Sequence, residues 1–324
     1  MIDQYNRTID YLRISVTDRC NFRCVYCMPE EGVAQLCHHD ILTFDEIIKI
    51  CKSAVKLGIH RIKITGGEPL LRKDLEHLIR MIHEIDGIHE LTMTTNGYYL
   101  EERLEALKEA GITGINISID TLDEGAFENI TRHEGLEKVV SSLRKAIAIQ
   151  IPSVKVNCVP MKQNEKDLCQ IAALAKEYPV HVRFIEMMPI GLGELFQGIY
   201  QDKILSQLER IYGIARPCRE RLGNGPARYY SFPEFQGKIG FISAMSHEFC
   251  EDCNRIRLTA DGDLKLCLNY GSRWNLRDFI RSGASEKQLT EYMYQAIYHK
   301  PRRHGFLEIK GCEKEIRKMA GIGG

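Results

Sequence analysis

Six of the twelve cysteines fall into two groups of three whose spacing is typical of metal or cluster ligands. Cys20, Cys24 and Cys27, the first cysteine group, have the spacing Cys-x3-Cys-x2-Cys. Three thiolates so close in sequence can face one point only if the loop wraps around a ligand. A structural zinc site normally takes four protein ligands, whereas an iron–sulfur cubane held by three thiolates keeps one iron open for a small molecule. Completion of a zinc site by His38 or His39 remains the alternative.

The second cysteine group is Cys250, Cys253 and Cys267, with the spacing Cys-x2-Cys-x13-Cys. It again supplies three ligands, and His247 could complete a zinc site, so this spacing alone is ambiguous. Disulfides are not expected, because a cytosolic compartment keeps thiols reduced. A metal-binding or redox-sensing protein without catalysis would also explain both groups.

Two arginines beside the second cysteine group indicate a bound anion. Arg255 and Arg257 share one face of an extended segment, and guanidinium groups bind phosphate through paired hydrogen bonds. The alternative is a surface strand with ordinary solvated arginines. The chain has 44 basic and 44 acidic residues and a pI of about 7.1, which argues against nucleic-acid binding through bulk charge. Any anionic partner must therefore be held by locally placed cations.

The elements that would position these residues alternate between short strands and amphipathic helices over residues 11–188. Strand, helix, strand at this spacing predicts parallel βα units, in a barrel or part-barrel, with a doubly wound sheet as the alternative. In either architecture the chemistry lies at the carboxyl ends of the strands. The six expected strands are Tyr11–Val16, Ile59–Thr65, Leu91–Thr95, Ile115–Ile119, Val154–Val159 and Val180–Met187.

Helix signals and a change of composition complete the expected order of elements. Thr43 and Glu46 form a capping box at the start of a helix that Gly58 ends. Glycine and proline become frequent beyond Pro189, so we expect a boundary near residue 190 that separates residues 1–190 from residues 191–324. The elements expected in the second part are strands at Arg228–Phe232 and Lys238–Ile242 and helices at Leu276–Arg281 and Glu286–Tyr298.

Targeting signals are absent from the pattern of apolar residues. No apolar run approaches the roughly 18 residues that span a bilayer. Residues 1–11 are polar and lack the apolar stretch of a secretory signal. We therefore expect a cytoplasmic protein that has neither a membrane nor a nucleic acid as partner. We expect it to be either a monomer or a homodimer.

The first cysteine loop, Cys20-Asn21-Phe22-Arg23-Cys24-Val25-Tyr26-Cys27, resembles the signature of the radical S-adenosylmethionine superfamily. Thr65-Gly66-Gly67-Glu68-Pro69 resembles the second motif of that superfamily. The resemblance implies a partial (β/α)6 TIM-like barrel and a [4Fe-4S] cluster whose open iron binds S-adenosylmethionine, which is cleaved to give a 5′-deoxyadenosyl radical. From the residues themselves, the two glycines permit close approach of the backbone to a ligand, and Glu68 could accept a hydrogen bond from an ammonium.

With the second cysteine group included, the whole chain resembles the GTP 3′,8-cyclase family of molybdenum cofactor biosynthesis. The resemblance implies a second [4Fe-4S] cluster on the second cysteine group, with the guanine of GTP at its open iron. It also implies abstraction of the C3′ hydrogen and addition of C3′ to C8, which gives (8S)-3′,8-cyclo-7,8-dihydroguanosine 5′-triphosphate. Another radical S-adenosylmethionine enzyme with an auxiliary cluster, such as a peptide-modifying one, is the alternative, although those enzymes generally have more cysteines downstream.

The resemblance also implies roles for single residues. Lys63 stands where relatives often have arginine, so the charge is kept and the planar fork is lost. The implied contacts to S-adenosylmethionine are Tyr26, Gly67, Ser118 and Met188. The implied contacts to GTP are Arg13, Lys63, Thr94, Lys155, Arg255, Ile256 and Arg257.

Further implications of the resemblance concern the end of the chain and the partners. Gly323 and Gly324 resemble a family tail that reaches into the active site and assists cyclisation. The implied partners are an external electron donor of the flavodoxin or ferredoxin type and the next enzyme of the pathway, cyclic pyranopterin monophosphate synthase, which receives the product.

Overall fold

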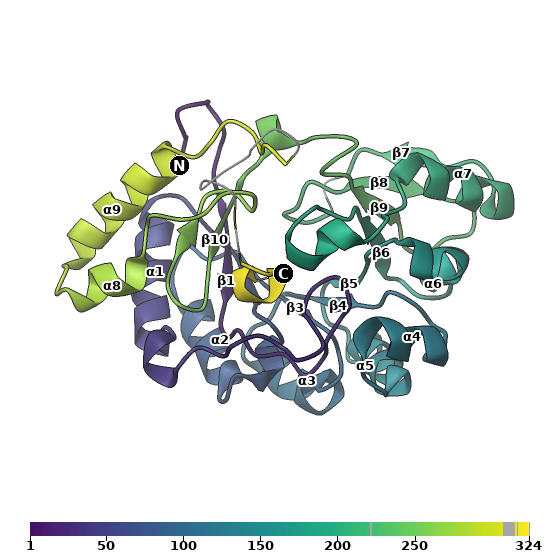
Figure 1. The fold of residues 1–324 in the computed structure, drawn as a ribbon, viewed down its shortest axis with the longest axis horizontal. Helices are drawn as coiled ribbons and strands as arrows, with labels where there is room; N and C mark the ends of the chain where they lie inside the picture. The colour runs from purple at the N-terminus through teal and green to yellow at the C-terminus, as the bar shows by residue number, and fades with distance from the viewer. Residues whose placement is uncertain (221, 307–314, 316, 324) are drawn as a thin grey trace.

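The computed structural model describes residues 1–220, 222–306, 315 and 317–323. Its centre is a curled sheet of eleven strands in the order β11-β10-β1-β2-β3-β4-β5-β6-β9-β8-β7. Helices cover the outside of the curled sheet, and the chain ends inside it (Figure 1). This is the partial (β/α)6 barrel that the sequence predicted, extended at both edges.

The six central strands run parallel and follow each other along the chain. Each agrees with its predicted range to within two residues, because apolar and polar side chains alternate along most of them. The central strands are β1 (Tyr11–Ser15), β2 (Arg61–Thr65), β3 (Glu90–Thr95), β4 (Gly114–Ser118), β5 (Val154–Cys158) and β6 (His181–Ile185).

The second part of the chain adds strands to both edges of this sheet. On one edge β9 pairs with β6 in parallel, and on the other β10 pairs with β1 in parallel. The predicted strands of this part are confirmed, and the extended segment that carries Arg255 and Arg257 is β10. The added strands are β7 (Arg216–Cys218), β8 (Arg228–Ser231), β9 (Ile239–Ile242), β10 (Arg255–Leu258) and β11 (Leu264–Lys265).

The first helix follows its local signals. Thr43 accepts a hydrogen bond from the backbone N–H of Glu46, whose side chain accepts one from the N–H of Thr43, as the capping box predicted. The helix ends at Lys56, and Gly58 has a φ of +81°. Buried apolar residues on one face of the helix hold it against the sheet.

Ten α-helices are present in the part of the chain that the structure describes, and none of these is long and apolar enough to cross a membrane. The α-helices are α1 (Phe44–Lys56), α2 (Leu75–His83), α3 (Leu100–Glu109), α4 (Glu124–Thr131), α5 (Leu136–Ala148), α6 (Leu168–Glu177), α7 (Gln201–Tyr212), α8 (Leu276–Arg281), α9 (Glu286–Tyr298) and α10 (Met319–Ile322). The 3-10 turns are η1 (His38–Asp40), η2 (Pro69–Leu71), η3 (Lys162–Asp167), η4 (Gly191–Leu195) and η5 (Cys250–Asp252).

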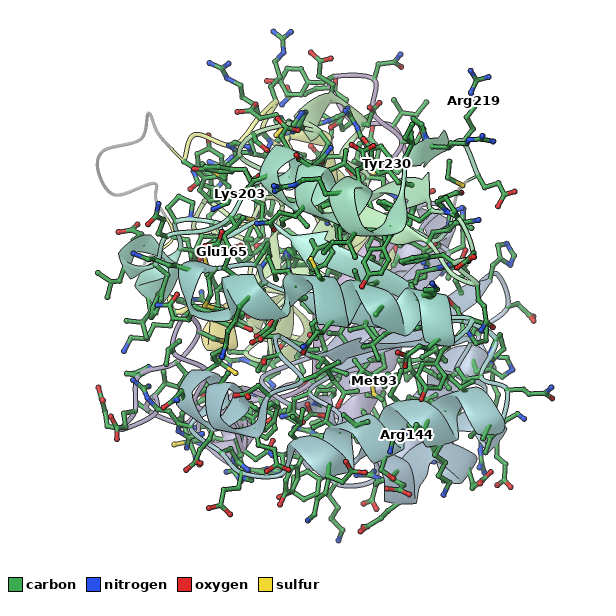
Figure 2. The ribbon with its side chains drawn as sticks, turned by 90° about the vertical axis from the view of Figure 1, so that its right-hand side faces the viewer. Met93, Arg144, Glu165, Lys203, Arg219 and Tyr230 are labelled. Carbon is green, nitrogen blue, oxygen red and sulfur yellow. The ribbon has the colours of Figure 1, made fainter. Side chains whose placement is uncertain are left out.

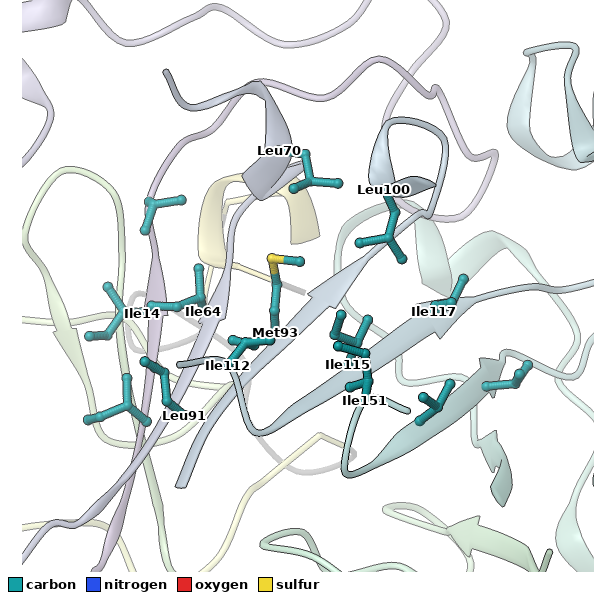
Figure 3. Packing of buried hydrophobic residues seen from close by; sticks show 14 of the residues in the cluster. Ile14, Ile64, Leu70, Leu91, Met93, Leu100, Ile112, Ile115, Ile117 and Ile151 are labelled. Carbon is teal, nitrogen blue, oxygen red and sulfur yellow. The ribbon is translucent and has the colours of Figure 1, made fainter. Parts of the chain in front are cut away.

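The hydrophobic core lies between the outer face of the sheet and the helices. Alternate residues of neighbouring strands, such as Ile14, Ile64 and Ile115, point into it, and Figure 3 shows their packing. Polar side chains stay on the outside of the helical layer, as Arg144 of α5 does in Figure 2. The other face of each strand is therefore free to line the interior of the barrel.

Candidate active site

A cavity of about 550 Å³ fills the interior of the curled sheet. Alternate residues of the strands line this cavity, and the residues between them point into the hydrophobic core. On β4, Asn116 and Ser118 line the cavity, whereas Ile115 and Ile117 are buried on the other face. The residues beyond the strands' carboxyl ends, such as Asp120, also line it. Polar and apolar residues thus alternate along β4, and the polar ones face the barrel interior.

The first cysteine group lies at this cavity. Cys20, Cys24 and Cys27 all line it, in the loop after β1. Burial raises the pKa of Cys20 to about 12 and that of Cys27 to about 11, and burial followed by the charges of the other two thiols raises the pKa of Cys24. Three thiols this close in a low-dielectric site become thiolates only with a cationic group between them. The donor set therefore fits an iron–sulfur cluster.

The second motif supports this loop. The backbone N–H of Gly67 donates to Thr17 O at 2.8 Å, and that of Glu68 donates to Arg19 O at 2.7 Å. A Cβ atom on Gly67 would collide with the carbonyl of Arg19, and one on Gly66 would lie 2.8 Å from Thr17 O. These glycines let the cysteine loop pack against the end of β2, and both also line the cavity.

Glu68 also has partners within the protein. Its carboxylate accepts hydrogen bonds from the N–H groups of Leu70 and Asn96 and from the Thr95 hydroxyl, at 2.7–3.0 Å. Burial raises its pKa to about 7. The Asn96 side-chain amide in turn lies 4.0 Å from Cys20 Sγ. Glu68 therefore joins the ends of β2 and β3 beneath the cysteine loop.

The residues expected to contact S-adenosylmethionine lie around the first cysteine group. Tyr26, Gly67, Ser118 and Met188 all line the cavity. The Tyr26 hydroxyl donates to Asp120 Oδ2 at 2.7 Å, which ties the cysteine loop to the end of β4. Burial raises the pKa of Asp120 to about 6. Asp120 was not assigned to the site from the sequence, although its inward direction was visible in the alternation after β4.

Three cations stand side by side across adjacent strands. In the registers of β10, β1 and β2, Arg13 is the direct partner of both Arg257 and Lys63. All three line the cavity, together with Arg255. Like charges directly opposite each other in a sheet are destabilising. We call these four residues, with Lys155 and Arg183, the cation row.

Lys155 and Arg183 extend the cation row on β5 and β6. Lys155 Nζ donates to the carbonyl of Leu222. Arg183 donates to the side-chain carbonyls of Asn157 at 2.9 Å and Asn116 at 2.8 Å, which are neutral partners. The sequence analysis missed Arg183. Its signal was available, because the residues on either side of it in β6 are apolar and buried in the core.

Members of the cation row repel one another, and burial adds to the cost of their charge. Burial, followed by Arg183, Arg13 and Lys155, holds the pKa of Lys63 well below its usual range. Burial and Arg183 lower the pKa of Lys155 to about 8. Glu90 is the carboxylate that opposes both shifts, and it pairs with Arg61 at 3.6 Å. Buried cations that repel each other fit a site for a polyanion.

The second cysteine group is gathered around the β10–β11 hairpin. Cys253 precedes β10, Cys267 follows β11, and each thiol affects the pKa of another. Burial alone would raise the pKa of Cys253, but Lys300 and Arg255 lower it to about 6. That thiol is a thiolate at neutral pH and is suited to bind a metal. The cavity lining, within the described residues, includes Arg255 and none of these three cysteines.

Histidines do not complete either group into the zinc sites that were considered. The ligand atoms of His39 lie within 4.8 Å of those of Cys37 and Asp40, not of the first cysteine group. Near the second group, His304 approaches Cys250 and Glu248, and His247 is not in that set. Within the described residues, the three sulfur atoms of neither cysteine group all lie within 4.8 Å of one another.

The remaining predicted contacts differ in their position. Thr94 lines the cavity and accepts a hydrogen bond from Asn116 at 3.3 Å. The Ile256 side chain is buried in the core on the opposite face of β10 from its two arginine neighbours, so only its backbone could reach a ligand. The carbonyl of Gly323 accepts a hydrogen bond at 2.7 Å from Arg257, which lines the cavity. Gly324 lies outside the described residues.

Comparison with known proteins agrees with this site. Residues 14–175 match the family model described as the Radical SAM superfamily, and residues 180–306 match that described as Molybdenum Cofactor Synthesis C. The "GTP 3',8-cyclase" of Clostridium perfringens (strain 13 / Type A) is 44% identical over 325 residues and that of Desulforamulus reducens is 42% identical over 331 residues. Both matches cover 100% of this chain and 100% of the relative.

Solved structures show the same fold at much lower identity. SuiB from Streptococcus suis has a TM-score of 0.65 and 14% identity, over 92% of this chain and 68% of that chain. SuiB bound to S-adenosylmethionine has a TM-score of 0.64 and 15% identity, over 90% and 68%. At this identity the likeness shows the fold alone. The full-length relatives establish the rest: this chain is a radical S-adenosylmethionine enzyme and belongs to the GTP 3′,8-cyclase family.

Proposed function

We propose that this enzyme converts GTP into (8S)-3′,8-cyclo-7,8-dihydroguanosine 5′-triphosphate, the first step of molybdenum cofactor biosynthesis. The observation that carries the proposal is the cation row, which lines the same cavity as the first cysteine group. A nucleoside triphosphate carries about four negative charges, and positioned cations in a low-dielectric cavity bind it specifically. The relatives that match the whole chain are named for this activity.

The first cysteine group would hold one [4Fe-4S] cluster with S-adenosylmethionine at its open iron. When bound, the cluster supplies the electron that cleaves S-adenosylmethionine, and the resulting 5′-deoxyadenosyl radical removes the C3′ hydrogen of GTP. The protein's part is to orient the reactants. Tyr26 and Ser118 bind the nucleoside, and Met188 covers it from the end of β6. The hydrogen bond from Tyr26 to Asp120 fixes the loop that carries the cysteines.

The cation row binds the triphosphate. Arg13, Lys63 and Arg257 stand at the same level on three adjacent strands, and Lys155 and Arg183 face them from β5 and β6. A polyanion replaces the repulsion among these cations with attraction, so binding energy is available to hold the ribose in one orientation. Thr94 adds a hydroxyl at the end of β3.

The second cysteine group would hold a second [4Fe-4S] cluster, which binds the guanine through its open iron. Cys253 is suited to this role because Lys300 and Arg255 favour its thiolate form. Arg255 lies between this group and the cavity, so it can contact a substrate that spans the distance from the second cluster to the cation row. The backbone of Ile256 is the remaining contact of β10.

We also propose an electron donor, an enzyme that receives the product, and separate roles for the two parts of the chain. A flavodoxin or ferredoxin would supply electrons in the cytoplasm, and cyclic pyranopterin monophosphate synthase would take up the product. The barrel of residues 1–190 would form the S-adenosylmethionine site, and residues 191–324 would complete the GTP site. The strands that this second part adds beside β1 and β6 support that division of labour.

One experiment tests the proposed function. Anaerobically reconstituted protein would receive dithionite and S-adenosylmethionine, with and without GTP, and 5′-deoxyadenosine and the cyclised nucleotide would be measured. We expect 5′-deoxyadenosine to form only with GTP and in proportion to cyclised product. Formation that ignores GTP would favour another radical S-adenosylmethionine enzyme, and no formation at all would favour a metal-binding or redox-sensing protein.

A further inference from the structure

The end of the chain lies inside the curled sheet. The short helix α10, drawn in yellow at the centre of Figure 1, precedes Gly323. Ile322 packs in a small hydrophobic cluster with Ile190 and Phe306. Gly323 has a φ of +85°, and a Cβ atom there would lie 2.9 Å from Ser15 Cβ. Gly323 is therefore packed against Ser15 of β1.

This segment contacts both halves of the proposed site. The Arg257 guanidinium donates to the carbonyl of Gly323 at 2.7 Å. The backbone N–H of Ala320 donates to Cys27, a member of the first cysteine group. Met319 lines the cavity between them. The segment thus touches one proposed cluster ligand and one member of the cation row.

Three ion pairs hold the residues just before α10. The Glu315 carboxylate pairs with Lys265 of β11, and the two side chains are 3% and 0% exposed. Arg317 pairs with Asp263 and with Asp261, the latter at 3.3 Å, in the turn between β10 and β11. We call these five residues the ionic latch. These three ion pairs all join the segment to the hairpin that the second cysteine group surrounds.

The ionic latch also acts on the cation row. Lys265 is the direct cross-strand partner of Arg257 in the β10–β11 hairpin. Without a carboxylate nearby, the two cations would repel each other. Glu315 supplies that carboxylate, so the segment neutralises Lys265 while its Gly323 carbonyl holds Arg257. Binding of the segment and the arrangement of Arg257 are therefore coupled.

We propose that Glu315 and Arg317 are positioning residues, whose ion pairs to the β10–β11 hairpin seat residues 317–323 against Cys27 and Arg257 and thereby set the hydrogen bonding of the first cluster. The seating itself does not depend on the proposed function. Its effect on a cluster does, and rests on the [4Fe-4S] group proposed for the first cysteine group. Two measurements keep these parts separate.

Limited proteolysis tests the seating on the full-length, reconstituted protein. Lys-C cleavage after Lys318 releases residues 319–324, which mass spectrometry detects. We expect Glu315→Gln and Arg317→Gln each to speed this cleavage about tenfold or more, because proteolysis follows the population of the open form. Glu137→Gln and Arg144→Gln, which break the exposed Glu137–Arg144 pair, are the matched controls. Cleavage after the exposed Lys73 normalises the rates.

A redox titration tests the consequence for the first cluster. Its EPR signal would be followed with S-adenosylmethionine bound, so that it reports on this cluster. An N–H group directed at a ligand sulfur stabilises the reduced, more negative cluster. We therefore expect a more negative midpoint potential in Glu315→Gln and in Arg317→Gln, and recovery towards the parent value in Arg317→Lys.

A double-variant cycle separates seating from a general effect on the fold. Gly323→Val should also unseat the segment, because its φ is positive and Ser15 is in the way. Glu315→Gln should then add nothing to the shift in midpoint potential that Gly323→Val causes. Unchanged cleavage after Lys318 in both latch variants would overturn the seating. Faster cleavage with an unchanged potential would overturn the effect on the cluster.

Discussion

Arg13 on β1 and Lys63 on β2 are direct cross-strand partners, and both side chains line the cavity inside the barrel. Arg257 faces Arg13 from the other side, so three cations occupy one level of the sheet. A fold gains nothing from such an arrangement when no anion is bound. We therefore expect substitutions in the cation row to affect stability and substrate binding in opposite directions.

Lys63→Met should show this opposition. Removing a buried cation that Arg13, Lys155 and Arg183 repel should raise the free energy of unfolding of the GTP-free protein by roughly 1–3 kcal/mol. It should also weaken GTP binding by about 1.5–3 kcal/mol, through the loss of a charge-assisted hydrogen bond. Thermal unfolding without GTP and calorimetric titration with GTP would measure the two effects.

The control for this prediction is Lys203→Met, which removes a lysine that pairs with Glu165 on the outer surface (Figure 2). It should leave GTP binding unchanged and the free energy of unfolding within about 0.5 kcal/mol. A Lys63→Met protein that is less stable and still binds GTP normally would show that this lysine is a structural residue.

Lys155 should make GTP binding depend on pH. Its pKa is lowered to about 8 by burial and Arg183, with Glu90 opposing the shift. The triphosphate favours the charged lysine, so GTP affinity should fall as pH rises through about 8, and binding near pH 8–9 should take up a proton. Calorimetry in buffers with different ionisation enthalpies would measure this uptake, and in Lys155→Met it should disappear.

The same shift has a defined sign for stability. An unfolded lysine keeps its pKa of 10.5, so between pH 8 and 10.5 the unfolded chain binds more protons at Lys155 than the folded one. The contribution of Lys155 to the free energy of unfolding therefore rises with pH across this interval. Below pH 8 the lysine is charged in both states, and the destabilisation of the folded protein by this buried charge is at its full value. The difference between the parent and Lys155→Met unfolding curves should show this rise, and a flat difference would contradict the lowered pKa.

Local signals predicted much of the barrel from the sequence. The capping box at Thr43 and the apolar periodicity of the βα units depend on neighbours in the chain, and both are confirmed. The pairing of β10 with β1 depends on residues more than 240 positions apart, such as Tyr11 and Arg255, and no local pattern contains it. The twelve residues of α7 were not among the elements expected in the second part of the chain.

The sequence predicted the cysteines of the site more completely than the residues that hold those cysteines and the end of the chain in place. Cysteine spacing is a property of the chain, so both cysteine groups could be recognised. The supporting role of Glu68 could not be predicted, because its hydrogen bonds to Thr95 and Asn96 form only when β2 and β3 lie side by side. The ion pair of Glu315 with Lys265 needs the end of the chain to return to β11, which no local pattern indicates.

Cys253→Ala should separate the two clusters. Losing a thiolate that Lys300 and Arg255 stabilise should lower iron and sulfide from about eight to about four per chain. The first cysteine group would remain, so some 5′-deoxyadenosine should still form, while cyclised product should be lost. Cys218→Ala, at a cysteine outside both groups, is the control. Normal product yield in Cys253→Ala would make the second group structural.

Gly67→Ala should remove the first cluster by disturbing the loop that holds it. The new Cβ atom would collide with the backbone of Arg19, one residue before Cys20, so the loop must move away from the end of β2. We expect iron and sulfide to fall to about half and the cleavage of S-adenosylmethionine to be lost. Gly125→Ala is the control: its Cβ would meet nothing closer than 3.6 Å in α4, and it should stabilise the protein by about 0.5–1 kcal/mol. Full iron content in Gly67→Ala, with weaker binding of S-adenosylmethionine, would show that this glycine acts as a ligand contact and that the loop does not depend on it.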